Sequence, residues 1–511
     1  MMHRCLLIHE IVQNIADSVR TSDTRATLYM ALTCRAFFDP AMNAVWRTVV
    51  NPAHLLLTLP ERTRKITRDG LLTIVQAPSA ADWSRFESYA RRVRILYCYF
   101  SVRIKRGTKY PAVNWLSVAQ FYLGQQLLPN LRTFKGGCRD DDSDGYPLFI
   151  KPPLRDLHLD FFHIGCAEPT ARCMSQCSKT LETLWVETED RDDGDDGVVK
   201  MLSGAIAGLE VLRELTIGVL FPDAIHHLSS LRMLGRLTFR LEVGDDSTST
   251  LSFPALEYLQ IQCGAEDHPC RSLVAPFLQR LAAPVLSELM LRYDTCFPSY
   301  REPVRLSAAD VHEIFCAVSQ LAQLRELNLD GTWSLAPQYP AQFLTSSMLS
   351  PLYSLAHLAV LDIRAVPIVL APRDILPMAQ AWPKMQDLML CSWDTDEHLE
   401  CYPEAADLSA FAQHCPHLRE LSLPVCVRRV TQHRDSICMP AHLELKRLHI
   451  AKADDSGTQD AALFLARTFP KARVVQGASH EVLDAMNDAI VREVLRCRPE
   501  DATGEDRRLN T

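Results

Sequence analysis

The stretch Leu154-Arg155-Asp156-Leu157-His158-Leu159 carries apolar residues at its first, fourth and sixth positions. The same six-residue word, with conservative exchanges, recurs along most of the 511-residue chain. Eleven full copies share this spacing, although the interval between copies varies from 22 to 38 residues. Weaker copies begin at Val93 and Leu131, and the full ones begin at Leu154, Leu181, Leu212, Leu234, Leu256, Leu286, Leu324, Leu358, Met385, Leu418 and Leu445. A recurrence of this kind indicates a chain built from stacked units.

Each word predicts one short parallel strand. Its last two apolar residues stand two positions apart, so both side chains point to the same side of a strand. Amphipathic stretches between words predict helices at 198–208, 307–322, 374–381, 407–414 and 460–469, and residues 472–475 predict a last strand. A strand–helix unit leaves one apolar face bare, which a neighbouring unit must cover. The sequence therefore predicts an α/β solenoid, a horseshoe with parallel strands inside and helices outside.

The first fifty residues predict three short helices. The first helix carries an apolar stripe at helical spacing: Ile8, Ile11, Ile15 and Val19. Residues 21–23 end this helix and offer N-caps for a second helix over 24–37, and a third is expected to start at Asp39 with Pro40 in its first turn. So small a module cannot bury all of its apolar side chains, and the apolar surface left over favours a partner protein.

These patterns divide the chain into five expected parts. Residues 1–50 form the helical module, 51–92 a linker and a helix that joins it to the repeats, and 93–478 the solenoid. Residues 479–498 form a C-terminal capping helix, and 499–511 a polar tail that is expected to be disordered. Asp82 is a candidate cap for the joining helix. The cluster Arg62, Arg64, Lys65 and Arg68 is interpreted as a solvated helix face, with a binding patch as the alternative.

Composition limits the classes of partner and compartment. The net charge of −8 argues against a general nucleic-acid binder, which would carry a basic face. The longest apolar run, near 355–370, is interrupted by His357, Asp362 and Arg364, so no membrane association is expected. The apolar run from Cys5 to Ile8 is too short for a signal peptide. The 17 scattered cysteines suit free thiols in a reducing compartment, so we expect a cytoplasmic or nuclear protein.

Motifs that could carry catalysis or bind a metal are weak. Asp140, Asp142 and Asp144 with Gly145 imitate the start of a calcium loop, but Lys151 stands where that loop needs a bidentate glutamate. Cys173 and Cys177 have no second close cysteine pair to complete a zinc site, and His226-His227 adds only an adjacent histidine pair. The acidic run 187–196 is interpreted as a solvated loop, with a dock for a basic segment as the alternative. We expect no catalytic residue, metal or cofactor.

The outward-facing residues of the strands are the candidate binding surface. The residue before the second apolar position of each word is acidic in six of the eleven words: Asp156, Glu214, Glu288, Glu326, Asp387 and Glu420. This stripe could attract a basic partner segment, or it could only keep an open sheet soluble and unpaired. Trp185, Met290 and Asn328 occupy the next outward positions, and Trp and Met are typical interface anchors. The expected contacts with a bound protein are Trp185, Glu214, Glu288, Glu326, Met290 and Asn328.

The same residues resemble a known family. The segments Cys5–Ile11, Thr33–Phe37 and Trp46-Arg47 resemble an F-box, and the words resemble leucine-rich repeats. The segment from Asp82-Trp83 through Phe86, Tyr89-Ala90 and Val93 to Leu96 is similar to the one that follows the F-box in a fungal family with irregular leucine-rich repeats. His9 departs from that family, which usually has proline before the glutamate of the first helix.

The resemblance implies a substrate adaptor of a Skp–cullin–F-box ubiquitin ligase. In that family the N-terminal helices bind the Skp adaptor, the cullin completes the ligase, and the repeats present a protein substrate. The adaptor-binding residues it implies here are Leu7, Ile8, Ile11, Ile15, Cys34 and Trp46. The alternative is a leucine-rich-repeat interaction scaffold outside a ubiquitin ligase, which His9 favours. An enzyme is the third possibility, and no motif supports it.

Overall fold

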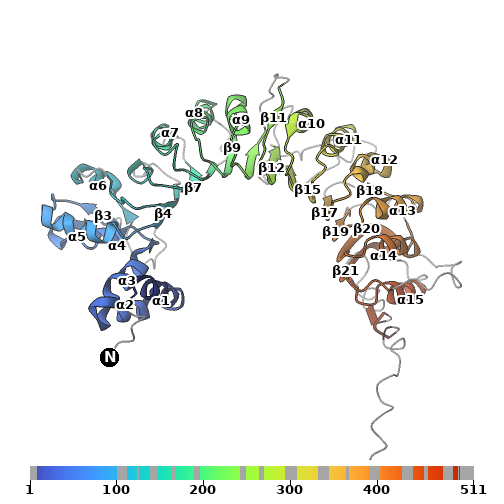
Figure 1. Cartoon of the computed structure of the whole chain (residues 1–511), viewed down its shortest axis with the longest axis horizontal. Helices are drawn as coiled ribbons and strands as arrows, with labels where there is room; N and C mark the ends of the chain where they lie inside the picture. Colours follow the sequence, from blue (N-terminus) through green and yellow to red (C-terminus); the bar gives the residue numbers. More distant parts are fainter. Residues whose placement is uncertain are drawn as a thin grey trace, which may run out of the picture. The chain divides into compact units, whose positions relative to one another are not determined.

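The computed structural model contains two compact units, residues 1–239 and 240–511 (Figure 1). The two units are each built mainly from parallel strands and helices. The described residues are 8–68, 70–100, 112–122, 126–138, 147–162, 167–188, 196–241, 249–263, 270–293, 308–331, 344–363, 368–390, 403–427, 441–453, 458–475, 487–488, 490–492 and 494.

Three helices form the start of the first unit: α1 (His9–Ser22), α2 (Thr24–Thr33) and α3 (Arg35–Trp46). Asp23 caps α2, as the sequence allowed, because its carboxylate accepts a hydrogen bond from the Arg25 N–H at 2.7 Å. The predicted start of the third helix is wrong. Cys34 has extended backbone, which ends α2 early, and α3 already begins at Arg35. Pro40 lies inside α3, where it is buried and its carbonyl accepts a hydrogen bond from Gln13 of α1 at 3.3 Å.

The segment that joins the module to the repeats has structure of its own. It contains α4 (Ala53–Leu56), a 3₁₀ turn (Glu61–Thr63), β2 (Arg64–Ile66), β3 (Leu71–Ile74) and α5 (Ala80–Ala90). Strands β2 and β3 pair antiparallel, and β3 pairs in parallel with β5 (Ala112–Val113). Gly70 has a φ of 79° in the turn between β2 and β3, a backbone region that favours glycine.

Two expectations for this segment need correction. Arg64 and Lys65 lie on strand β2 rather than on a helix, because the hairpin buries Leu72 and Ile74 on one side. Asp82 is not the N-cap of α5 but the third residue of a capping box whose N-cap is Ser79. The Asp82 carboxylate accepts a hydrogen bond from the Ser79 N–H at 2.9 Å, and Arg62 forms an ion pair with it at 2.8 Å.

The repeats of the first unit supply one strand each to a parallel sheet. Strands β1, β4, β6, β7, β8 and β9 pair in that order, and β10 follows β9. Helices α6, α7, α8 and α9 cover one face of these strands (Figure 1). The bounds are β1 (Thr48–Val49), β4 (Ile95–Phe100), α6 (Trp115–Phe121), β6 (Thr133–Cys138), β7 (Asp156–Phe162), α7 (Ala167–Gln176), β8 (Thr183–Thr188), α8 (Asp196–Ile206), β9 (Glu214–Val219), α9 (Pro222–Ser229) and β10 (Arg236–Arg240).

The second unit repeats the same plan. Strands β12, β14, β15, β17, β19, β20, β21 and β22 pair in parallel in that order. The strand bounds are β12 (Tyr258–Cys263), β14 (Glu288–Tyr293), β15 (Glu326–Gly331), β17 (Val360–Ile363), β19 (Asp387–Met389), β20 (Glu420–Val427), β21 (Arg447–Ala453) and β22 (Arg473–Val474). The helices are α10 (Cys270–Arg280), α11 (Ala308–Val318), α12 (Ser346–Leu349), α13 (Pro372–Ala381), α14 (Ser409–His414) and α15 (Thr458–Thr468). Short parallel pairs join β11 (Leu251–Ser252) to β13 (Leu281–Ala282) and β16 (Leu344–Thr345) to β18 (Ile368–Val369).

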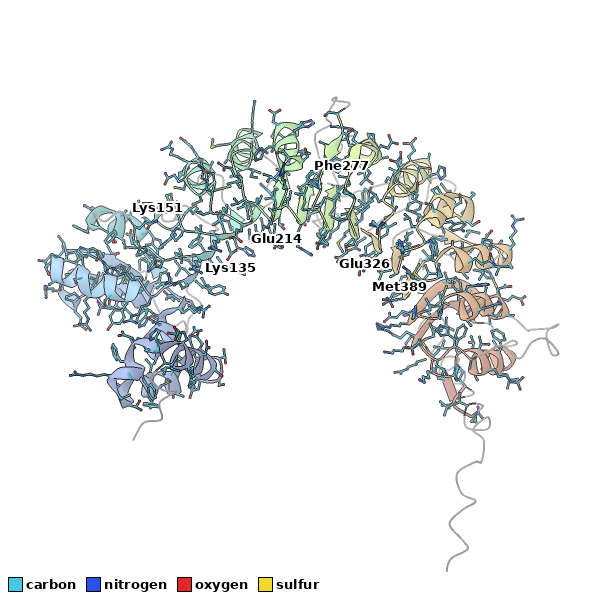
Figure 2. The ribbon with its side chains drawn as sticks, in the orientation of Figure 1. Lys135, Lys151, Glu214, Phe277, Glu326 and Met389 are labelled. Carbon is cyan, nitrogen blue, oxygen red and sulfur yellow. The ribbon has the colours of Figure 1, made fainter. Side chains whose placement is uncertain are left out.

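The apolar positions of the words form the core of both units. Wherever side-chain burial is described, all of these positions in the eleven words are buried. Adjacent words stand in register, as where Leu289 pairs with Leu327 and Leu291 with Leu329. The α/β leucine-rich-repeat fold predicted from the words is therefore confirmed. The face of the strands opposite the helices is called the open face below, and Glu214, Glu326 and Met389 lie on it (Figure 2).

Buried polar side chains connect successive repeats in the second unit. Trp382 donates a hydrogen bond to the Leu352 carbonyl at 3.0 Å, and the Cys415 thiol lies 3.4 Å from the Trp382 carbonyl. His442 accepts a hydrogen bond from the Leu445 N–H at Nδ1, so its Nε2 carries the proton donated to the Cys415 carbonyl at 2.9 Å. These bonds satisfy polar groups that would otherwise be buried without partners.

The C-terminal parts are described only in places. Residues 487–488, 490–492 and 494, which fall in the predicted capping helix, are helical. The Asn487 side chain bonds both the N–H and the carbonyl of Val474, at 3.0 and 3.1 Å, and so occupies polar groups of β22. The predicted tail 499–511, the aspartates of the calcium-like motif at 140–145 and most of the acidic run lie outside the described residues.

Candidate functional site

The interior of the three-helix module is made of small side chains. Its buried residues are Val12 and Ala16 in α1, Thr27 and Ala31 in α2, and Pro40, Ala41 and Ala44 in α3. Phe37, Val45 and Trp46 are half-buried. Seven other large apolar side chains are exposed: Ile8, Ile11, Ile15, Leu28, Tyr29, Leu32 and Phe38. A folded domain normally buries its largest apolar groups. The module therefore leaves apolar surface that another protein could cover.

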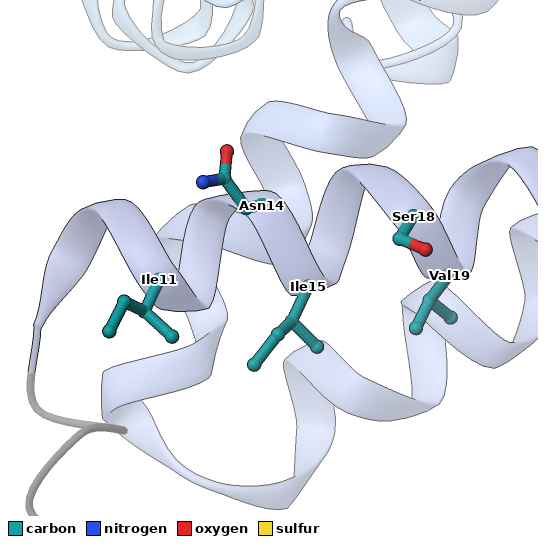
Figure 3. Close-up of a pocket in the computed structure, with 5 residues that line it drawn as sticks. All are labelled: Ile11, Asn14, Ile15, Ser18 and Val19. Atoms are coloured by element: carbon teal, nitrogen blue, oxygen red, sulfur yellow. The ribbon is translucent and has the colours of Figure 1, made fainter.

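One side of α1 carries the most regular part of this surface. Ile8, Ile11 and Ile15 are 47%, 37% and 38% exposed. Together with Val19 they form what we call the isoleucine face, and Figure 3 shows Ile11, Ile15 and Val19 extending from the same side of the helix. A shallow hollow of about 360 Å³ lies here, lined by Ile11, Asn14, Ile15, Ser18 and Val19. Its lining is apolar with two small polar groups, which suits an apolar side chain of a partner helix.

The other residues that the resemblance assigns to adaptor binding lie elsewhere. Leu7 is outside the described residues. Cys34 is a half-buried free thiol between α2 and α3. Trp46, at the end of α3, is half-buried and its ring centroid lies 4.9 Å from that of Tyr89 in α5. The structure thus places Ile11 and Ile15 on one side of α1 with Ile8 directly before the helix, and it turns Trp46 toward the chain's own joining helix.

Polar contacts also hold the module to α5. Arg92, which follows α5, forms an ion pair with Asp39 at 2.6 Å and donates a hydrogen bond to the Asn43 side chain. Arg47 pairs with Asp17 of α1 at 3.2 Å. These contacts were not visible in the sequence, because the partners are up to 53 residues apart. They leave the isoleucine face uncovered by any residue that the structure describes.

Trp185 is the main aromatic candidate on the open face of the first unit. Its side chain is 37% exposed, and its ring stacks on His158 of the neighbouring strand with centroids 4.8 Å apart. Strand register places Thr216 on its other side. A large ring held flat on one neighbour loses little conformational freedom on binding, which suits an interface anchor. Glu214 lies one strand away, half-buried, with Arg236 at 3.7 Å.

The remaining candidates lie together in the second unit. Glu288 pairs in register with Glu326, and Met290 pairs with Asn328, so these four residues form two adjacent rows on the open face. The row of Glu326 continues through Val360 to Asp387 and Glu420. All four predicted contacts are half-buried. The acidic stripe predicted from the words is therefore contiguous here except at Val360.

The acids of this row influence one another. Partial burial, followed by the negative charges of Glu288 and Asp387, raises the pKa of Glu326. Burial also raises the pKa of Asp387, although Arg419 and Arg447 act to lower it. Glu420 is compensated by an ion pair with Arg447. The centre of the row, at Glu326, is thus the position where a bound positive charge would relieve the most repulsion.

The weaker chemical motifs have plain structural roles where they are described. Cys173 and Cys177 are buried free thiols, and burial raises the pKa of Cys177 to about 12, which keeps it unreactive. His227 bonds the Leu209 carbonyl at 2.8 Å. Within the described ranges, no three His, Cys, Asp or Glu side chains converge as metal ligands would. Nor does any helix in those ranges have the length and hydrophobicity needed to cross a bilayer.

Comparisons with known proteins identify no family for this chain. No protein-family model matches the sequence, and no curated protein matches it. One solved structure that it matches is the crystal structure of CroV588, a circular leucine-rich-repeat protein, at 10% sequence identity and a TM-score of 0.25. The match covers 77% of this chain and 55% of that one, so this chain spans about half the length of that protein. The repeat assignment rests on the strands and buried words of the chain itself.

Proposed function

We propose that this chain is a substrate-recognition adaptor of a Skp–cullin–F-box ubiquitin ligase. In this proposal the three-helix module binds the Skp adaptor, and the open face of the repeats binds a protein substrate. The partner proteins supply the catalysis, so the chain itself is not an enzyme and needs no cofactor. It would act in the cytoplasm or the nucleus, without binding nucleic acid or a membrane.

The observation that carries the proposal is the inverted distribution of apolar side chains in the module. Small residues such as Ala16, Ala31 and Ala44 fill the interior, whereas Ile11 and Ile15 face outward. Fully burying an isoleucine contributes about 1.5–3 kcal/mol, so a free module gives up stability that a complex would recover. The F-box-like sequence of the same helices supports the Skp adaptor as the protein that covers this face.

The test is a titration of the full chain with purified Skp adaptor by isothermal calorimetry. Ile11→Asp and Ile15→Asp place a charge in the proposed contact, and each should weaken binding by at least about tenfold. Ile66→Asp is the matched control, because Ile66 is 51% exposed on β2, outside the module. It should bind like the unaltered chain.

Two outcomes would count against the proposal. One is the absence of any binding by the unaltered chain, and the other is equal affinity for the Ile11, Ile15 and Ile66 variants. Trp46→Ala is a poorer probe of docking, since its loss also removes the contact with Tyr89.

The second candidate function is an interaction scaffold outside a ubiquitin ligase. Two observations favour it: His9 stands where the resembled family has proline, and Trp46 contacts the chain's own α5. In this case the open face would still bind proteins. Lowering the level of the chain in cells would leave the turnover of every bound partner unchanged, whereas an adaptor requires at least one partner to persist longer.

A further inference from the structure

In the first unit, a row of arginines runs across the sheet at the N-terminal ends of the strands, at the residue just before each strand. The backbone carbonyl of each of these residues accepts a hydrogen bond from the corresponding residue of the next repeat. Arg94 N–H bonds the Arg47 carbonyl, Arg132 the Arg94 carbonyl and Arg155 the Arg132 carbonyl, at 2.8–2.9 Å. The row continues through Glu182, Arg213 and Gly235. We call Arg47, Arg94, Arg132, Arg155 and Arg213 the arginine ladder.

Strand geometry does not require arginine at these positions. The chain has 54 lysines and arginines among 511 residues, yet five of seven consecutive positions in this row are arginine. The equivalent row of the second unit is mixed in character: Glu257, Ser287, Arg325, Ala359, Gln386, Arg419 and Lys446. The same backbone arrangement therefore accepts acidic, neutral and basic side chains, and the ladder is specific to the first unit.

One end of the ladder is neutralised within the chain. Arg155 and Arg213 share the Glu182 carboxylate, at 3.1 and 3.6 Å. The acidic residue thus stands between two arginines and binds both. Asp156 and Glu214, on the strands that follow, add further negative charge at this end.

At the other end of the ladder Arg47 forms an ion pair with Asp17, but Arg94 and Arg132, between the two paired ends, keep their positive charge. Arg94 donates a hydrogen bond only to a carbonyl, that of Asn130 at 3.2 Å, and neither Arg94 nor Arg132 has a carboxylate partner among the described residues. Burial lowers the pKa of Arg94, and the positive charges of Arg132 and Arg47 lower it further. The lowered pKa is what is expected where charges of the same sign lie close together. Lys135 is the third residue of β6, the strand that follows Arg132, and is in register with Tyr97 of β4. Its Nζ lies 6.0 Å from the centre of the Tyr97 ring and adds a third cation.

We propose that Arg94, Arg132 and Lys135 form a subsite that binds a short aspartate- or glutamate-rich segment of a protein substrate. The proposal deepens the proposed function and rests on it only in treating the open face as the substrate surface. A guanidinium fork matches a carboxylate with two parallel hydrogen bonds. Neighbouring strands are about 4.8 Å apart, so cations on β4 and β6 can bind carboxylates spaced along one extended segment.

The surroundings limit the length and class of this segment. On the next strands Glu182 is paired with Arg155 and Arg213, and Glu214 with Arg236, so a polyanion that continued across the sheet would meet compensated charges there. A nucleic acid is therefore a poor occupant. A peptide of a few acidic residues spans Arg94, Arg132 and Lys135 and ends before the strands whose charges are paired.

The test measures binding of a labelled tetraglutamate peptide to the full chain at low ionic strength, with a tetralysine peptide as the charge control. Arg132→Gln should weaken tetraglutamate binding by about tenfold, the expected loss of one charge-assisted contact. Arg94→Gln should act in the same direction. Arg213→Gln is the matched control, because Glu182 already neutralises Arg213; it should change the affinity by less than about twofold. Arg132 has an exposed side chain, so its variant should melt at the same temperature as the parent.

The outcomes separate this subsite from the proposed function. Loss of peptide binding with Skp adaptor binding retained supports the subsite. Unchanged affinity in both the Arg94 and Arg132 variants overturns it, whatever the adaptor result. Tighter binding of duplex DNA, or of a peptide whose only acidic group is one phosphoserine, through the same arginines would overturn the assignment to carboxylates.

Discussion

At the scale of single residues, the position of His9 is the clearest departure from the resembled family. It is the first residue of α1, where a backbone N–H has no partner within the helix, and the preceding Ile8 has extended backbone with φ −87° and ψ 115°. That conformation is the one favoured before proline. The backbone at Ile8 and His9 would therefore accept a proline at position 9. Histidine there lacks the fixed φ that proline would supply to the start of α1, but it leaves the isoleucine face in place.

His9→Pro should therefore stabilise the chain. We expect the free energy of unfolding to rise by about 0.5 kcal/mol, because proline restricts the unfolded chain and loses no helical hydrogen bond at the first position. Affinity for the Skp adaptor should stay equal or increase. Denaturant titration and calorimetry measure the two effects. Gln13→Pro is the control inside α1, where a loss of about 3 kcal/mol is expected; equal losses in both variants would contradict the arrangement described for His9.

Residues that act through distant contacts could not be assigned from sequence. Trp46 stays a predicted adaptor contact, but its contact with Tyr89 of α5, 43 residues away, could not be predicted because local spacing does not encode the relative position of two helices. Pro40 fitted a first-turn position, but α3 begins at Arg35 and Pro40 lies inside it, with its carbonyl bonded by Gln13 of α1. Ile11 and Ile15 were predictable as one stripe because a helical period alone fixes which side they share.

At the scale of strands and helices, the words determined the structure because each fixes three inward positions and the register with its neighbours. The outward rows follow from the same register, so the alignment of Glu288 with Glu326 could be expected from the words alone. The hairpin of β2 and β3 was missed because its strands are short and carry no word. The arginine ladder could not be predicted from the words, because the position before each strand lies between the apolar positions and no spacing rule fixes its side chain.

The acidic row of the second unit makes a pH prediction. An acid whose pKa is raised in the folded state holds its proton more tightly there than in the unfolded chain. Its charged form therefore destabilises the fold, and stability falls as the pH rises above 4.5, the ordinary pKa of glutamate. Glu326→Gln should raise the melting temperature at neutral pH, by an amount that corresponds to under about 1 kcal/mol because the side chain is partly solvated.

This gain should disappear when the pH falls well below 4.5. Glu444→Gln, at an exposed position of the same unit, should change nothing at either pH. Thermal melts of the three proteins at neutral and acidic pH make the comparison. A lower melting temperature for Glu326→Gln at neutral pH would show that Glu326 stabilises the fold, and would remove the argument that its charge serves a partner.

At the scale of the whole molecule, the chain carries two kinds of surface. The module presents exposed isoleucines over an interior of small residues, and the repeats present polar and charged rows over an interior of leucines. The first surface is apolar and suits one constant partner, whereas the second is polar and varied along the sheet, as substrate recognition requires. This division of roles is what the ligase-adaptor proposal explains.

The most direct measurement is hydrogen–deuterium exchange of the full chain with and without purified Skp adaptor. Binding should slow exchange in peptides from α1, α2 and α3 and leave the strands of both units unchanged. Protection of the strands with none in α1, or no protection anywhere at saturating adaptor, would contradict the claim that the module is the docking surface.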